Sequence, residues 1–162
     1  MNLRAIEPPA LYKLIGYLEA VSDFIRTGEL KWDFDIKLFE YDEVVSDVRL
    51  LVKSAYPGSF PDKAQIIEGS LSDLVNIFKH EFGRGSQQSE LLTNLTPVTE
   101  MRGEMWNYLN GCLSLPGARL YVYTASDMLD DFGSGGIIGN FAAVILNESQ
   151  RRCLFLSGGD CD

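Results

Sequence analysis

The sequence predicts one α+β domain over residues 1–162, in which a helix-rich first two-thirds packs on a mainly antiparallel sheet closed by a C-terminal hairpin. Two observations predict this class. Apolar residues recur at three- and four-residue steps in several segments before residue 112, which is the period of an amphipathic helix. The segments from residue 119 onward are rich in β-branched and aromatic residues, which fit a pleated sheet better than a helix.

The first predicted helix runs from Pro9 to Arg26, and its prolines suit the first helical turn while Gly28 suits the position just after the end. Its buried stripe consists of Leu11, Leu14, Ile15, Leu18, Val21 and Ile25. The apolar period then shortens to two, because Trp32, Phe34, Ile36 and Leu38 alternate with Asp33, Asp35 and Lys37. This alternation predicts a strand with one buried face and one acidic face.

A second helix is predicted after Asp42, ending at residues 56–58, and a short strand is predicted over residues 64–67. The apolar face of that helix consists of Val44, Val45, Val48, Leu51, Val52 and Ala55. Ser70 and Asp73 have the spacing of a capping box and predict a helix to Phe82. The last predicted helix begins at residues 96–97, a threonine followed by proline, and ends at Gly111.

Three strands are predicted to close the fold, over residues 120–125, 141–146 and 151–156. The middle segment is apolar at every position, which predicts a central strand covered on both faces. The four polar residues 147–150 have the length of a hairpin connection. Cys153 is predicted to lie in the core, and Cys161 in an acidic tail.

The formal net charge of −9 is concentrated in three segments. Residues 29–47 carry −5, the three aspartates between 127 and 131 carry −3, and Asp160 with Asp162 carries −2. Such a field attracts basic proteins and repels nucleic acid and anionic membranes, so we expect neither of the latter as a partner. The alternative is that these acids form a solvated surface that only keeps the protein soluble.

The sequence predicts a soluble cytoplasmic protein. Its N-terminal residues lack the apolar run and small-residue cleavage site of a signal peptide. The longest uncharged run, residues 132–147, is shorter than a membrane-spanning helix and contains four glycines. Three cysteines without a CxxC pair are typical of a reducing compartment rather than of a disulfide framework.

The sequence contains no recognisable catalytic, metal or cofactor motif. The glycine cluster Gly133–Gly139 lacks the GxGxxG spacing and the Lys-Ser or Lys-Thr pair of a phosphate-binding loop. His80 is the only histidine, so a serine hydrolase base and a histidine-rich zinc site are both disfavoured. The aspartates near residue 130 do not have EF-hand spacing. We therefore expect a protein that is not an enzyme and that needs no cofactor.

These observations favour a non-catalytic, acidic protein-binding domain of bacterial type, such as an immunity or inhibitor protein that covers the active surface of a basic toxin or effector. Either a monomer or a dimer fits this reading. A small enzyme or ligand-binding domain with a pocket near Gly133–Gly139 is one alternative, and an acidic mimic of nucleic acid is another. The predicted partner-binding residues are Asp33, Asp35, Glu40, Tyr41, Asp42, Glu43, Asp127, Asp130 and Asp131.

Overall fold

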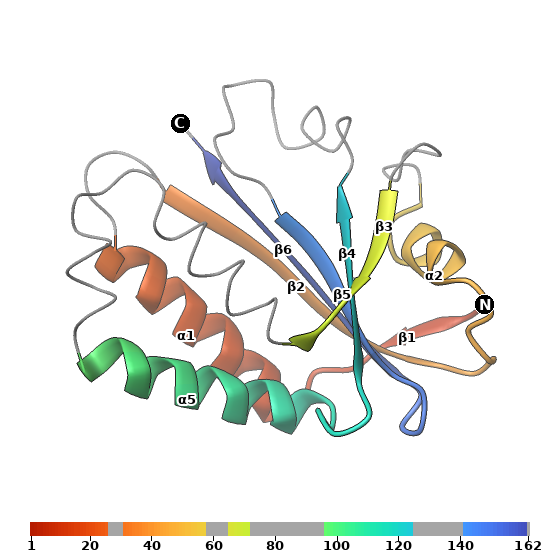
Figure 1. Cartoon of the computed structure of the whole chain (residues 1–162), viewed down its shortest axis with the longest axis horizontal. Helices are drawn as coiled ribbons and strands as arrows, with labels where there is room; N and C mark the ends of the chain where they lie inside the picture. Colours follow the sequence, from red (N-terminus) through yellow and green to blue (C-terminus); the bar gives the residue numbers. More distant parts are fainter. Residues whose placement is uncertain (26–30, 58–64, 72–95, 125–140, 162) are drawn as a thin grey trace.

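The computed structural model describes residues 1–25, 31–57, 65–71, 96–124 and 141–161 (Figure 1). The elements in these ranges, in chain order, are β1 (Leu3–Ala5), α1 (Pro9–Ile25), β2 (Lys31–Tyr41), α2 (Val48–Ala55), β3 (Gln65–Gly69), α5 (Thr96–Cys112), β4 (Arg119–Thr124), β5 (Phe141–Asn147) and β6 (Arg152–Cys161). The helices predicted to begin at Pro9 and Thr96 are confirmed, as are the strands predicted around residues 31–41, 64–67 and 120–125.

The six strands form one sheet in the order β1-β2-β6-β5-β4-β3, and every neighbouring pair is antiparallel. The molecule is therefore an α+β protein, as the sequence predicts. In the described part of the chain, β1, β2 and β3 alternate with helices, so the first two-thirds supplies half of the strands as well as the helices. The two middle strands of the sheet are β6 and β5.

One face of the sheet is covered by α1 and α5, which lie side by side (Figure 1). Leu14 of α1 and Leu109 of α5 are buried against Leu38 and Leu154 of the sheet. The sequence predicts that Gly111 ends α5, yet the helix continues to Cys112. A Cβ at Gly111 would lie 2.8 Å from the Cβ of Ala10, so this glycine allows the two helices to approach closely instead.

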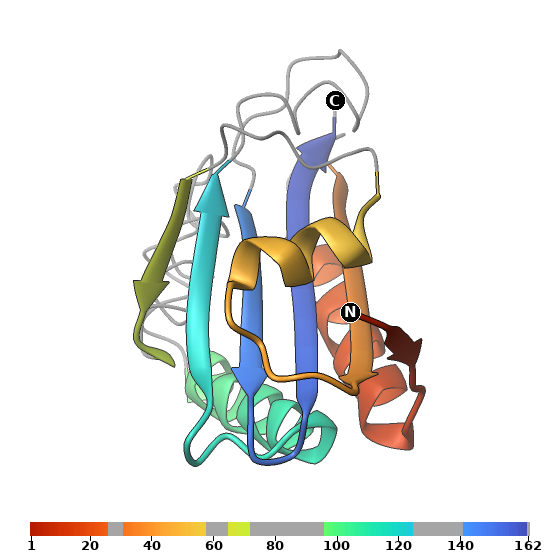
Figure 2. The ribbon, with the colours of Figure 1, turned by 90° about the vertical axis from the view of Figure 1, so that its right-hand side faces the viewer.

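The opposite face is covered by α2, which lies across the strands (Figure 2). Leu51 and Val52 of α2 are buried in a second core cluster with Tyr121 and Phe155 of the sheet. The prediction that Val44 and Val45 belong to this helix is wrong, because α2 begins at Val48. The helix begins there because Asp47 caps it: its side chain accepts a hydrogen bond from the backbone N–H of Arg49, at 2.8 Å.

β5 is the central strand that its uninterrupted apolar sequence predicts. Ala143 and Ile145 face the α1 and α5 side, whereas Val144 and Leu146 belong to the cluster beneath α2. Coverage on both faces is therefore confirmed. The strand expected to end at Leu156 continues instead to Cys161, which pairs with Lys31. The predicted acidic tail that contains Cys161 is therefore part of β6.

Several expected features lie outside the described residues: residues 72–82 of the helix predicted from Ser70, His80, and the cluster Gly133–Gly139. None of the helices in the described ranges is long and apolar enough to cross a membrane.

Candidate protein-binding surface

The chain leaves the sheet at Tyr41 and reaches α2 through a six-residue connection, residues 42–47. Within it Val45 is buried, but Val44 leaves 81% of its surface exposed. On α2, Leu51 and Val52 face the sheet, so the preceding residue, Leu50, faces solvent and is 51% exposed. Two large apolar side chains are thus presented to solvent within seven residues. We call Asp42, Glu43, Val44, Asp47 and Leu50 together the β2–α2 surface.

The three carboxylates of the β2–α2 surface are all exposed and are held by backbone groups. The Asp42 side chain accepts a hydrogen bond from the Asn2 backbone N–H at 3.3 Å, and the Asp42 carbonyl accepts one from Arg151 at 3.1 Å. Asp47 uses one oxygen to cap α2. Glu43 is 65% exposed, with the Met1 amino group 3.6 Å from its carboxylate. The connection is therefore tethered to the two residues that precede β1 and to the β5–β6 turn, while its acids stay on the surface.

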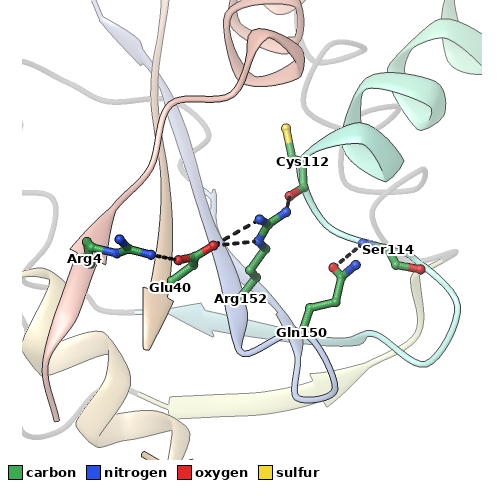
Figure 3. Close-up of polar contacts among 6 residues, drawn as sticks. All are labelled: Arg4, Glu40, Cys112, Ser114, Gln150 and Arg152. Atoms are coloured by element: carbon green, nitrogen blue, oxygen red, sulfur yellow. Dashed lines mark hydrogen bonds and ion pairs between the residues drawn. The ribbon is translucent and has the colours of Figure 1, made fainter. Parts of the chain in front are cut away.

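Glu40 lies between two arginines at the end of β2 (Figure 3). Its Oε2 pairs with Arg4 of β1, and its Oε1 accepts hydrogen bonds from Arg152 of β6 at 3.0 and 3.3 Å. Arg152 also donates to the Cys112 carbonyl, at 3.4 Å, and so reaches the last residue of α5. Hydrogen bonds from Arg4 and then Arg152 lower the pKa of Glu40 below its ordinary value of 4.5. Its charge is therefore largely neutralised within the protein.

The turn between β5 and β6, next to the Glu40 and Arg152 pair, is held in place by polar side chains. The Gln150 side chain accepts a hydrogen bond from the backbone N–H of Ser114 at 2.8 Å (Figure 3). Asn147, which is buried, donates to the Ser114 carbonyl and accepts from Ser149 and from the Gln150 backbone. The hairpin end of β5 and β6 is thereby attached to the segment that follows α5.

Asp35 lies on the face of β2 that α2 covers, and its carboxylate is used to hold α2. The Tyr56 hydroxyl, one residue beyond α2, donates to Asp35 Oδ2 at 3.2 Å, and Lys37 Nζ lies 2.8 Å from the same oxygen. The Lys37 ammonium also stands 4.6 Å from the centre of the Tyr56 ring. Burial raises the pKa of Tyr56, so its hydroxyl stays protonated and remains a donor.

The other predicted partner-binding residues are placed as follows. Tyr41 is buried in the core beneath α2, where its hydroxyl donates to the Asn147 carbonyl at 3.4 Å. Burial raises the pKa of Tyr41 to about 12. Asp33 lies in β2 opposite Gly159 of β6. Asp127, Asp130 and Asp131 lie outside the described residues. The structure thus brings Asp42 and Glu43 together on the surface and separates them from Asp35.

The described residues hold no group of three or more histidine, cysteine or acidic side chains arranged to bind a metal ion. Cys112 and Cys153 are both buried thiols. Burial raises the pKa of Cys112 to about 11 and that of Cys153 to about 12, so both are protonated at neutral pH and are poor nucleophiles.

The sequence pattern does not identify Val44 and Leu50 as exposed side chains. Val44 fits a helical period that continues into α2, so the period predicts that it belongs to the buried stripe. The residue in the sequence that marks the start of α2 is Asp47, an N-cap residue type directly before Val48. A helix that starts after Asp47 leaves Val44 in the connection and turns Leu50 away from the sheet.

No known protein family model matches the chain, and no curated protein matches it. Solved structures similar to it include two crystal structures of citrus MAF1, in space groups P 31 2 1 and C 2 2 21. Each has a TM-score of 0.60 and 17% sequence identity, and the matches cover 89% and 90% of this chain and 98% and 99% of the citrus chains. At this identity the likeness concerns the fold only.

Proposed function

We propose that the protein is a non-catalytic protein-binding domain that docks a basic partner on its β2–α2 surface. The observation that carries this proposal is the exposure of Val44 and Leu50 among the carboxylates of Asp42, Glu43 and Asp47. Single exposed apolar residues are common, but two of them within a short acidic segment form the pattern of an apolar anchor with a charged rim.

The two kinds of side chain have separate roles in this proposal. Val44 and Leu50 supply the apolar contact that lengthens the lifetime of the complex, because burying them removes apolar area from water. Asp42, Glu43 and Asp47 speed the encounter with lysine and arginine side chains and select against acidic partners. Glu40 and Asp35 are assigned to the support of this surface, since their charges are already paired with Arg4, Arg152 and Lys37.

The class of protein that this arrangement fits is an inhibitor or immunity protein, which acts by occupying the functional surface of its target and needs no catalytic group. A basic toxin or effector that holds phosphate or nucleic acid would present the lysines and arginines that an acidic rim can pair with. The concentration of negative charge between residues 29 and 47 supports this choice of partner.

The experiment is site-specific photo-crosslinking in the native host, with a photoreactive amino acid placed at position 44. The matched control carries the same amino acid at Tyr12 of α1, which is 58% exposed and lies outside the β2–α2 surface. We expect position 44, and not position 12, to capture one protein with a basic surface, and we expect the purified target to lose activity as the protein is added in equal amounts.

Capture of the same protein with equal yield from both positions would contradict the choice of surface. Capture of a specific target whose activity is unchanged by saturating protein would contradict the inhibitor role while leaving the binding role in place.

A further inference from the structure

We infer that two copies of this chain pair through the edge strand β3 to form an antiparallel dimer with a continuous sheet. The inference concerns the sheet edge, and it is independent of the β2–α2 surface. Among the described strands, β1 and β3 are the two edges of the sheet (Figure 2). An edge strand presents unpaired backbone N–H and C=O groups on its outer side, and these groups are a template for another strand.

The two edges differ in how well they are protected. β1 has three residues, and its Arg4 side chain is 76% exposed, so a second strand would find a short and charged edge. β3 has five residues, Gln-Ile-Ile-Glu-Gly, with no proline and no lysine or arginine. Its central residue, Ile67, is 60% exposed. Edge strands are normally protected from pairing by short length, charge or proline, whereas β3 exposes an isoleucine at its centre.

The sequence of β3 is compatible with itself in one antiparallel register. With Ile67 on the two-fold axis, Ile67 lies opposite Ile67 of the second copy, Gln65 opposite Gly69, and Ile66 opposite Glu68. Directly opposed side chains approach to about 4.5–5.5 Å between Cβ atoms, so the two exposed isoleucines would cover each other. No like charges lie directly opposite in this register. Centring the pair on Glu68 would oppose two carboxylates, and centring it on Ile66 would leave Glu68 and Gly69 unpaired.

The neighbouring strand supports β3 in a fixed position for this pairing. All five residues of β3 are in register with β4, from Gln65 opposite Thr124 to Gly69 opposite Leu120. Ile66 packs into the core cluster beneath α2, so its neighbour Ile67 points to the other face of the sheet. A second copy would therefore meet an ordered edge. A five-residue contact is small, so we expect a concentration-dependent dimer that exchanges with the monomer.

The dimer and the complex with a basic partner should depend on salt concentration in opposite directions. Each chain carries a formal charge of −9, so two copies repel each other and added salt screens that repulsion. The dimer should therefore strengthen as salt rises, whereas an acidic surface binds a basic protein more weakly under the same change. Failure of one proposal is thus distinguishable from failure of the other.

The test is sedimentation equilibrium of the full chain over a wide range of concentrations and at two salt concentrations. We expect a mass that rises toward twice that of the monomer, with stronger association at high salt. Ile67→Lys should remove the association, and Tyr12→Lys, an equal change at a side chain of similar exposure on α1, should not. A wild-type protein that is monomeric throughout would overturn the inference, as would association that Ile67→Lys leaves intact.

Disulfide trapping checks the register without relying on a charged variant. Ile67→Cys should form a covalent dimer under mild oxidation, because the two thiols lie opposite each other. Glu68→Cys should form much less, because position 68 lies opposite Ile66, and the wild-type protein controls for the native cysteines. Equal trapping at both positions, or trapping only to a different protein, would contradict the two-fold pairing at Ile67.

Discussion

Arg152 of β6 donates hydrogen bonds both to Glu40 of β2 and to the last residue of α5. Two nitrogens of its guanidinium lie 3.0 and 3.3 Å from Glu40 Oε1, while the third donates to the Cys112 carbonyl. Arg4 of β1 pairs with the other carboxylate oxygen. One carboxylate thus links β1, β2 and β6, and one guanidinium links the sheet to a helix (Figure 3). Glu40 is therefore a structural residue at the border of the β2–α2 surface.

Arg152→Ala should destabilise the protein, because it leaves the Glu40 carboxylate with one cation and removes a donor from the Cys112 carbonyl. Arg119→Ala is the matched control, since Arg119 pairs with exposed Glu148 and an exposed pair contributes about 0–1 kcal/mol. Urea denaturation should show a loss for Arg152→Ala at least roughly twice that for Arg119→Ala. Equal losses would mean that the contacts of Glu40 and Arg152 stabilise the protein no more than an ordinary surface ion pair does.

The same network predicts a pH dependence. The folded pKa of Glu40 is lowered by its arginines, so its contribution to stability is present above the unfolded value of about 4.5 and is lost as the pH falls through the folded value. Glu40→Gln removes this contribution. The difference in unfolding free energy between wild type and Glu40→Gln should therefore shrink on acidification from pH 6 to about pH 3. A difference that stays constant over that range would show that the Glu40 charge does not favour folding.

Asp47 has two roles that substitution can separate. Asp47→Ala removes the cap of α2 and should cost about 0.5–2 kcal/mol of stability, whereas Asp47→Asn keeps a capping oxygen and removes the charge. We expect urea denaturation to show a clear loss for the alanine variant and little loss for the asparagine variant. If the asparagine variant lost as much stability as the alanine variant, the charge and not the hydrogen bond would be what supports α2.

The hydroxyl of Tyr56 should make a pH-dependent contribution to stability, in addition to the packing of its ring. Its folded pKa is raised above 10.0, so this contribution is fully present below pH 10 and is lost as the pH rises further. Tyr56→Phe keeps the ring, which packs edge-on against Phe155, and removes the hydrogen bond to Asp35. Between pH 9 and pH 11 the unfolding free energy of the variant should fall less steeply than that of the wild type. Parallel slopes would assign the alkaline loss to other groups.

The sequence predicts the α+β class and most of the described elements because each carries its own period. The every-position apolar run at residues 141–146 predicts a central strand, and the alternation at residues 32–38 predicts β2. The start of α2 was mispredicted because a helical period extends back to Val44, while the local hydrogen bond of Asp47 decides where the helix begins. The apolar period shows which face of a helix is buried, whereas the first residue of the helix is set here by one hydrogen bond from the capping side chain.

The candidate surface could be predicted only in part. Charge density identified the segment that contains Asp42 and Glu43, and the structure places both of these acids on the surface. Charge density could not show that Glu40 and Asp35 are already paired. Strand pairing brings Arg4 and Arg152 to Glu40, and the packing of α2 brings Tyr56 to Asp35. Those contacts join residues as far as 112 positions apart in the chain.

The most direct test of the proposed function compares two charge reversals of equal size in binding to the protein captured from position 44. Glu43→Lys changes the β2–α2 surface, and Glu104→Lys changes an exposed acid of α5. We predict that the dissociation constant rises roughly tenfold or more for Glu43→Lys and stays near the wild-type value for Glu104→Lys, with the difference shrinking at high salt. Equal affinities for the two variants at low salt would contradict the assignment of partner binding to the β2–α2 surface.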